Sequence, residues 1–305
     1  QDTGGPDRGE PGMSLRLGCD LPYFEDPTDV RAFAEAAEEI GFDHMGFSEH
    51  IARSRATEYT GVISFDDPWH ESFTLLAFLA AVTSRLELFS AMALVTLRHP
   101  VLVAKQGAEV SLLSSGRVRL GMSVGWNREE QVALGVDPTT RGKRLEEMIP
   151  LLRRLWTEDT VTHHGSFFVL DDVGIVPRPP EPVPIWMGAG GFETAGFPLD
   201  AAVSRAARLA DGFKLMAPTG VDVDRAIALA ERLQEAARAH GRALAIEARL
   251  LTQLTPPDGW AAVARRYRES GVITHLGLGN RIAGGTVHDQ IALIREVERR
   301  VRPEL

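Results

Sequence analysis

Two kinds of periodicity alternate along almost the whole chain, and this alternation is the strongest constraint on its fold. Eight short apolar runs, typical of buried strands, lie at Leu15–Asp20, Phe42–Ser48, Leu86–Met92, Arg117–Val124, Ile185–Gly188, Gly212–Met216, Ala245–Leu251 and Val272–Leu278. Each is followed by a stretch with helical periodicity: Thr28–Ile40, Ser72–Thr83, Val101–Leu113, Arg141–Trp156, Ala201–Ala210, Val223–His240, Trp260–Ser270 and Val287–Val301. Eight successive strand–helix units predict a single-domain parallel (β/α)₈ barrel, the TIM-barrel architecture. A doubly wound open sheet is the alternative, but it usually has fewer units or a second domain.

Insertions interrupt this rhythm. Residues 157–184 contain a predicted β-hairpin that turns near Gly165, followed by five prolines in Pro177–Pro184. Proline does not fit inside a helix or a central strand, so this segment is predicted to be an excursion between the fourth helix and the fifth strand.

Residues 1–12 are polar and rich in Gly and Pro. We interpret them as a disordered tail or a remnant of the expression vector, with no secretory signal, and place the barrel domain at 13–305.

Charge and cysteine content narrow the function classes. The chain has 33 Lys and Arg against 42 Asp and Glu, a net charge of −9, which disfavours nucleic acid as a partner. The longest apolar runs, such as Leu75–Val82, are far shorter than the roughly 20 residues of a membrane span. The one cysteine, Cys19, cannot form an internal disulfide or a cysteine-ligated zinc site. These features predict a cytoplasmic protein with a small-molecule substrate.

Polar residues follow the first two predicted strands. In a barrel of this type the active site lies at the C-terminal ends of the strands. Asp20 ends the first strand, and Glu49 and His50 end the second, so a carboxylate and an imidazole lie side by side on that face. The imidazole of His50 is suited to donate to a cofactor or to move a proton near neutral pH. A structural histidine bonded to a backbone carbonyl is an equally good interpretation of the position alone.

The ends of the third and fourth strands offer candidate walls for a planar ligand. Ser90, Ala91 and Met92 lie where the backbone can approach such a ligand closely, although spacing alone favours tight packing against the neighbouring strand. Trp126 is suited to form an apolar wall, and Asn127 to cap the helix that begins at residue 128.

The fifth strand ends in the run Gly188-Ala189-Gly190-Gly191. Small residues before a helix allow successive amides to converge on an anion, so this turn is a candidate phosphate site, although one glycine-rich turn is a weak signal. The glycine spacing of a dinucleotide-binding fold is absent after the first strand. No metal site is predicted, because His163 and His164 are neighbours on a strand and face opposite sides.

Ordered motifs over about Leu15–Gly212 resemble the luciferase-like monooxygenase superfamily, and most closely its branch dependent on the deazaflavin coenzyme F420. The segments that carry the resemblance are Thr83–Lys105, Leu113–Glu130, Arg141-Gly142, Leu155-Trp156, His164–Phe168, Pro184–Gly188 and Ala206–Gly212.

The resemblance implies a barrel that binds F420 or FMN at its C-terminal face and forms a homodimer. It implies a non-prolyl cis peptide bond among Ser90, Ala91 and Met92 that supports the flavin ring. The acidic–His pair corresponds to Glu49 and His50, with His50 at the reactive edge of the cofactor. The remaining cofactor contacts implied are Asp20, Gly125, Trp126 and the phosphate cradle Gly188-Ala189-Gly190-Gly191, and the Gly125-Trp126-Asn127 signature favours F420.

The chain also departs from the family pattern. Ala91 and Glu49 replace the more common glycine and aspartate, and residues 191–197 resemble an insertion in the phosphate loop. The members that oxidise sugar phosphates carry a Trp shortly after the His, and Ile51–Ser54 has none.

The leading hypothesis is a flavin- or deazaflavin-dependent oxidoreductase that acts on a small organic substrate. F420 would give hydride transfer, whereas reduced FMN with oxygen would give monooxygenation and require a partner flavin reductase. One alternative is a non-catalytic flavin-binding barrel. Another is a lyase or aldolase, for which Lys214 is the candidate Schiff-base residue. The helix with Phe73–Val82 is apolar nearly all round, which indicates burial in a homodimer, with deep burial under loops as the alternative.

Overall fold

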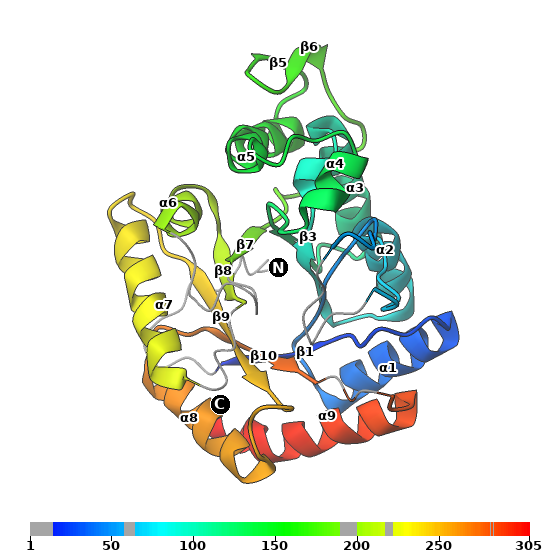
Figure 1. Cartoon of the computed structure of the whole chain (residues 1–305). Coiled ribbons are helices and arrows are strands. Elements are labelled where there is room, and N and C mark those ends of the chain that lie inside the picture. The colour runs from blue at the N-terminus through cyan, green and yellow to red at the C-terminus, as the bar shows by residue number, and fades with distance from the viewer. Residues whose placement is uncertain (1–14, 58–64, 190–199, 217–221, 281, 283) are drawn as a thin grey trace, which may run out of the picture.

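Eight parallel strands of the described residues close into a barrel (Figure 1), as the alternating pattern predicts. The computed structural model describes residues 15–57, 65–189, 200–216, 222–280, 282 and 284–305. Its barrel strands are β1 (Arg16–Asp20), β2 (His44–Phe47), β3 (Glu87–Ala93), β4 (Val118–Met122), β7 (Ile185–Ala189), β8 (Gly212–Leu215), β9 (Ala245–Leu251) and β10 (His275–Gly279). They follow one another around the barrel in the order β1-β2-β3-β4-β7-β8-β9-β10, with β10 pairing back to β1. The single-domain (β/α)₈ barrel is therefore confirmed. The predicted tail, residues 1–12, lies outside the described residues.

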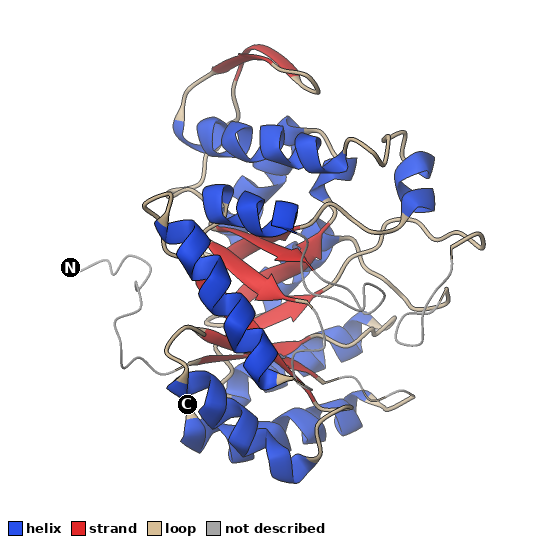
Figure 2. Cartoon of the chain, turned by 60° about the vertical axis from the view of Figure 1, so that its left-hand side comes forward, coloured by secondary structure: helices blue, strands red, loops and turns tan. Residues whose placement is uncertain are grey.

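Helices surround the barrel (Figure 2). They are α1 (Pro27–Ile40), α2 (Ser72–Val82), α3 (Pro100–Leu113), α4 (Arg128–Ala133), α5 (Arg141–Thr157), α6 (Asp200–Leu209), α7 (Val223–Arg238), α8 (Trp260–Glu269) and α9 (Val287–Val301). Their ends follow from local chemistry. Before α1, the side chain of Asp26 accepts a hydrogen bond from the Thr28 amide at 2.8 Å, and the helix ends at Gly41 with φ of 104°. None of the helices in the described part of the chain is long and apolar enough to cross a membrane.

The predicted hairpin lies outside the barrel wall, beyond α5 (Figure 1). It consists of β5 (Val161–His164) and β6 (Val169–Val173), which pair antiparallel. Glu147 of α5 holds it, because its carboxylate accepts hydrogen bonds from the amides of Ser166, Phe167 and Phe168 at 2.9–3.2 Å. The two histidines of β5 have different partners: His163 pairs with Glu147 and His164 with Asp171.

The barrel interior holds charged side chains as well as apolar ones. Arg119 and Lys214 are each 1% exposed, and Glu247 is fully buried between them. The Glu247 carboxylate lies 2.8 Å from a guanidinium nitrogen of Arg119 and 2.8 Å from Nζ of Lys214. Burial alone would raise the pKa of Glu247, but the charges of Lys214, His44 and Arg119 hold this pKa well below its usual value. The interior is therefore held together by compensated charges, which the apolar pattern of the strands does not reveal.

Candidate functional site

The imidazole of His50, just beyond the end of β2, is held by a buried carboxylate. Its Nδ1 lies 2.9 Å from Oε2 of Glu130, and the Glu130 side chain is 1% exposed. The other oxygen of Glu130 accepts hydrogen bonds from the amides of Ile51 and Ala52, at 2.5 and 3.0 Å. A carboxylate partner keeps the proton on Nδ1, which leaves Nε2 available to a ligand. Nε2 makes no hydrogen bond to the residues that the structure describes.

The short helix α4 places Glu130. Oδ1 of Asn127 accepts a hydrogen bond from the Glu130 amide at 3.2 Å, so Asn127 is the predicted helix cap. The third residue of the capped helix thereby points its carboxylate at the segment that follows β2. Thr57 links the same two segments, because its hydroxyl donates to Oδ1 of Asn127 at 3.1 Å.

Glu49 occupies a different position from its neighbour His50. Its carboxylate accepts hydrogen bonds from the amides of Ser72 and Leu94 at 2.8 and 2.7 Å, and from both terminal nitrogens of Arg98 at 2.6 and 3.0 Å. Arg98 also donates to Glu71 at 2.6 Å. Burial would lower the pKa of Arg98, but the two carboxylates outweigh it and raise this pKa. Glu49 therefore joins β2 to the start of α2 and the segment after β3, and its oxygens are occupied by these partners.

Aromatic rings gather beside His50. The ring centroid of Trp69 lies 4.8 Å from that of His50, and that of Trp126 lies 5.5 Å away, both nearly perpendicular to the imidazole. Tyr23 packs on Trp69 with 4.2 Å between centroids. Trp126 remains 38% exposed, so this wall is open on one side. The ring of Trp126 is thus next to the imidazole, as a pocket wall requires.

The end of β3 has the backbone geometry that the resemblance implied. The bond between Ala91 and Met92 is a non-prolyl cis peptide, and the register with β4 shifts between Ser90 and Ala93. The carbonyl of Ala91 accepts a hydrogen bond from the Ser48 hydroxyl at 2.9 Å, so this irregular backbone is tied to β2. Ser90, Ala91 and Met92 are all buried. The cis peptide is confirmed, and its contact with a cofactor stays a prediction.

Asp20 lies at the barrel mouth between two cations. One oxygen is 3.0 Å from Nζ of Lys214, and the other is 2.6 Å from a guanidinium nitrogen of Arg249. Lys214 is buried and contacts Glu247 as well, so its amine has no open approach for a substrate carbonyl. The geometry therefore gives no support to a Schiff-base lyase or aldolase.

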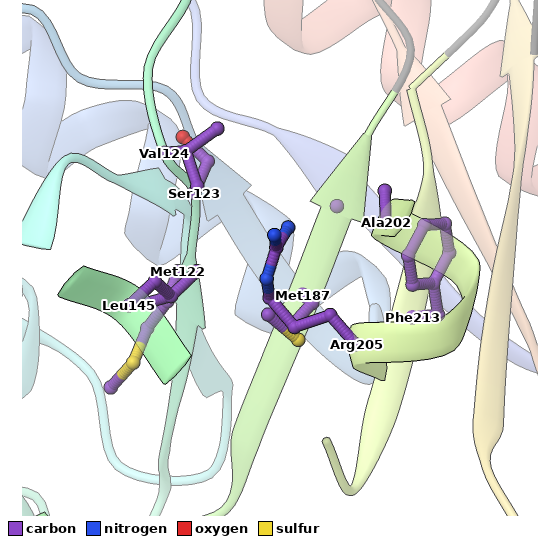
Figure 3. A pocket seen from close by; sticks show the side chains of 9 residues that line it. Met122, Ser123, Val124, Leu145, Met187, Ala202, Arg205 and Phe213 are labelled. Carbon is purple, nitrogen blue, oxygen red and sulfur yellow. The ribbon is translucent and has the colours of Figure 1, made fainter. Parts of the chain in front are cut away.

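A cavity of about 40 Å³ lies between the ends of β4 and β7 and helix α6 (Figure 3). The guanidinium of Arg205, from α6, points toward it, and the Nε of Arg205 donates to Glu146 at 3.0 Å. The cavity is lined by Met122, Ser123, Val124, Leu145, Met187, Gly188, Ala202, Arg205 and Phe213. Gly125, the residue after Val124 in the chain, has a φ of 73°, a conformation that favours glycine. Ala189 ends β7, and Gly190 and Gly191 lie outside the described residues.

Sequence reasoning assigned no individual role to four of these residues: Glu130, Arg98, Trp69 and Arg205. Glu130 was visible only as an acid in a helix's first turn, where acids are common for local reasons. No group of three or more His, Cys, Asp or Glu side chains in the described part of the chain is arranged to hold a metal ion.

The comparisons with known proteins agree with this fold. The profile of the luciferase-like monooxygenase family matches residues 5–281, so the chain belongs to that family of oxidoreductases. An uncharacterized protein of Mycobacterium tuberculosis is 32% identical over 271 residues, 85% of this chain and 88% of its own length. An F420-dependent glucose-6-phosphate dehydrogenase of Kineococcus radiotolerans is 32% identical over 237 residues, 76% of this chain and 65% of its own length. The solved structure of an F420-dependent secondary alcohol dehydrogenase superimposes with a TM-score of 0.73 at 17% identity, covering 95% of this chain and all of the other.

Proposed function

We propose that this protein is an F420-dependent oxidoreductase that transfers hydride to or from a small organic substrate. The observation that carries the proposal is the His50–Glu130 pair at the barrel mouth, with Nε2 available to a ligand. Oxidation of an alcohol, or reduction of a carbonyl, requires a proton to leave or reach the substrate oxygen. The similarity to an F420-dependent dehydrogenase supports F420 over FMN. No comparison supports the alternative of a non-catalytic flavin-binding barrel.

The residues around the cavity suit the cofactor. The Arg205 guanidinium and the Ser123 hydroxyl fit a phosphate, and Gly188 lines the same cavity. The cofactor contacts that we propose are Ser90, Ala91 and Met92 against the ring, Gly125 and Trp126 beside it, and Arg205 with Gly188-Ala189-Gly190-Gly191 at the phosphate. Asp20 has both oxygens engaged by cations, so we assign it an indirect role through Lys214 and Arg249.

When bound, F420 supplies a ring carbon that accepts or donates a hydride. The chain's own residues handle the proton. His50 accepts the hydroxyl proton at Nε2, while Glu130 keeps the other proton on Nδ1 and balances the charge that develops on the ring. Trp69 and Trp126 exclude water beside the imidazole. Glu49 is a positioning residue in this scheme, because its oxygens hold the segment that carries His50.

Cofactor titration is the first test. Tight quenching of F420 fluorescence, with no binding of FMN, is expected. Binding of FMN alone, with oxygen consumption by the reduced protein, would instead support a monooxygenase that depends on a flavin reductase. His50→Gln should retain F420 binding and lower kcat by roughly 10²–10⁴, the usual contribution of a general acid–base. Glu130→Gln should lower it by about 10–100-fold, as loss of a partner behind a catalytic His does elsewhere. Unchanged turnover in His50→Gln would refute the proposal.

We also propose a homodimer formed through α2 and α3. Leu102 is 51% exposed and Leu113 62% exposed on α3, and Phe78 of α2 is half-buried. These apolar side chains support burial against a second copy. Light scattering should give twice the chain mass, and Leu102→Glu should give the mass of one chain. Leu254→Glu is the control, because Leu254 has the same exposure as Leu102 and lies on neither helix.

The cytoplasmic location stays a prediction that rests on the single, buried Cys19.

A further inference from the structure

The side chains that flank His50 are the aromatic rings of two tryptophans, whereas an anionic ligand is usually bound by Arg or Lys. The imidazole meets the ring of Trp69 at 77° and that of Trp126 at 78°, and Tyr23 extends the aromatic surface behind Trp69. A molecule whose oxygen reaches Nε2 of His50 therefore meets aromatic surface.

The cations near the strand ends are already compensated. Arg98 pairs with Glu49 and Glu71, Lys214 with Asp20 and Glu247, and Arg249 with Asp20. Using one of them to bind a phosphate or carboxylate would leave a buried acid without its partner, which is costly. The group nearest to His50 is itself an anion, Glu130, and Glu129 lies beside it in the chain. Arg53 and Arg55, in the segment after β2, and Arg128, at the start of α4, are exposed, so anionic ligands are included in the test.

We infer that the substrate is an uncharged alcohol or carbonyl compound that carries an apolar ring or chain, which Trp69 and Trp126 bind beside His50. This inference rests on the proposed function and assigns the substrate class of that same site. An apolar group gains free energy by covering the exposed part of Trp126, and an aromatic group gains further from ring-to-ring contact. A neutral oxygen forms one hydrogen bond with Nε2 of His50 and leaves the ion pairs at the barrel mouth intact. A sugar phosphate has no apolar ring or chain, and its phosphate requires a cation in addition to Nε2.

Ligand binding to the purified full-length protein, with and without F420, tests the inference independently of turnover. The probes are 1-phenylethanol, its carboxylate analogue mandelate, and glucose 6-phosphate, followed by intrinsic tryptophan fluorescence and calorimetry. We expect 1-phenylethanol to bind at least tenfold more tightly than mandelate, and glucose 6-phosphate to give no saturable signal. Trp126→Ala should weaken 1-phenylethanol binding about tenfold, and Trp126→Phe should restore most of it. Leu134→Ala is the control, because Leu134 has a similar exposure, 39%, on the same segment.

Three results would overturn the inference. One is binding of glucose 6-phosphate or mandelate as tight as that of the alcohol. The second is unchanged alcohol binding in Trp126→Ala. The third is loss of F420 binding alone in that variant, which would confine Trp126 to the cofactor contact proposed above. Each of these leaves the proposed function standing if the wild-type protein binds F420, whereas failure to bind F420 removes the proposed function itself.

Discussion

Replacing Glu49 with Gln should destabilise the fold rather than remove a catalytic proton. The Glu49 side chain is fully buried, and that of Arg98, its partner, is 9% exposed. Breaking a buried pair by changing one member costs about 3–5 kcal/mol. The lower end applies, because Gln retains one carbonyl acceptor for the amides of Ser72 and Leu94, and Arg98 keeps Glu71. We therefore expect a loss of about 3 kcal/mol in the free energy of unfolding.

Thermal denaturation followed by circular dichroism measures this loss. At about 2–4 °C per kcal/mol for large domains, Tm should fall by about 6–12 °C. Arg98→Met should lower the free energy of unfolding by a similar amount. The double variant should lose less than the two single variants together, with a coupling energy of about 0.5–3 kcal/mol. Glu158→Gln is the control. Its pair with Arg154 is exposed on both sides, with side-chain values of 39% and 42%, and such pairs contribute little to stability. A Glu49→Gln protein with unchanged Tm and abolished turnover would refute this reasoning and make Glu49 catalytic.

Three further outcomes follow from the geometry. Burial, with the positive charge of Arg119, holds the pKa of His275 well below its usual value of 6.5. Only the unfolded state then takes up this proton, so as the pH drops from 6.5 this histidine should lower the free energy of unfolding by up to about 1.4 kcal/mol per pH unit. His275→Gln should reduce that slope in urea titrations, and the remainder should come from His44, whose pKa burial also lowers. Gly121→Ala would place a Cβ 2.2 Å from the carbonyl oxygen of Ser90, so we expect a loss of about 3 kcal/mol or more in thermal melts, and a loss under 1 kcal/mol would contradict this. Glu147→Gln should accelerate hydrogen exchange in residues 161–173 without a comparable change in the barrel strands, because its carboxylate holds the hairpin amides.

The fold could be predicted because every barrel strand and its following helix left a local signature. Strands buried on both faces read as short apolar runs, and the helices between them end at residues such as Gly41. The hairpin at 161–173 was visible because it breaks this rhythm and precedes a proline-rich segment. The charges inside the barrel were not visible, because Arg119, Lys214 and Glu247 occupy single positions within otherwise apolar runs. Periodicity reports which face is buried, and it does not report how a buried charge is compensated.

The partner of His50 could not be predicted from the sequence. The sequence places Glu49 next to His50, and adjacency suggests that the two act together. Neighbouring residues at the end of a strand point in different directions, so Glu49 is buried against Arg98 and α2 while His50 pairs with Glu130, 80 residues further along. That partnership depends on the closure of the barrel, which brings the segments after β2 and β4 together across β3, and on the cap that starts α4. The acid that matters to the imidazole is therefore a tertiary feature, and a substitution at Glu130 should change catalysis where one at Glu49 changes stability.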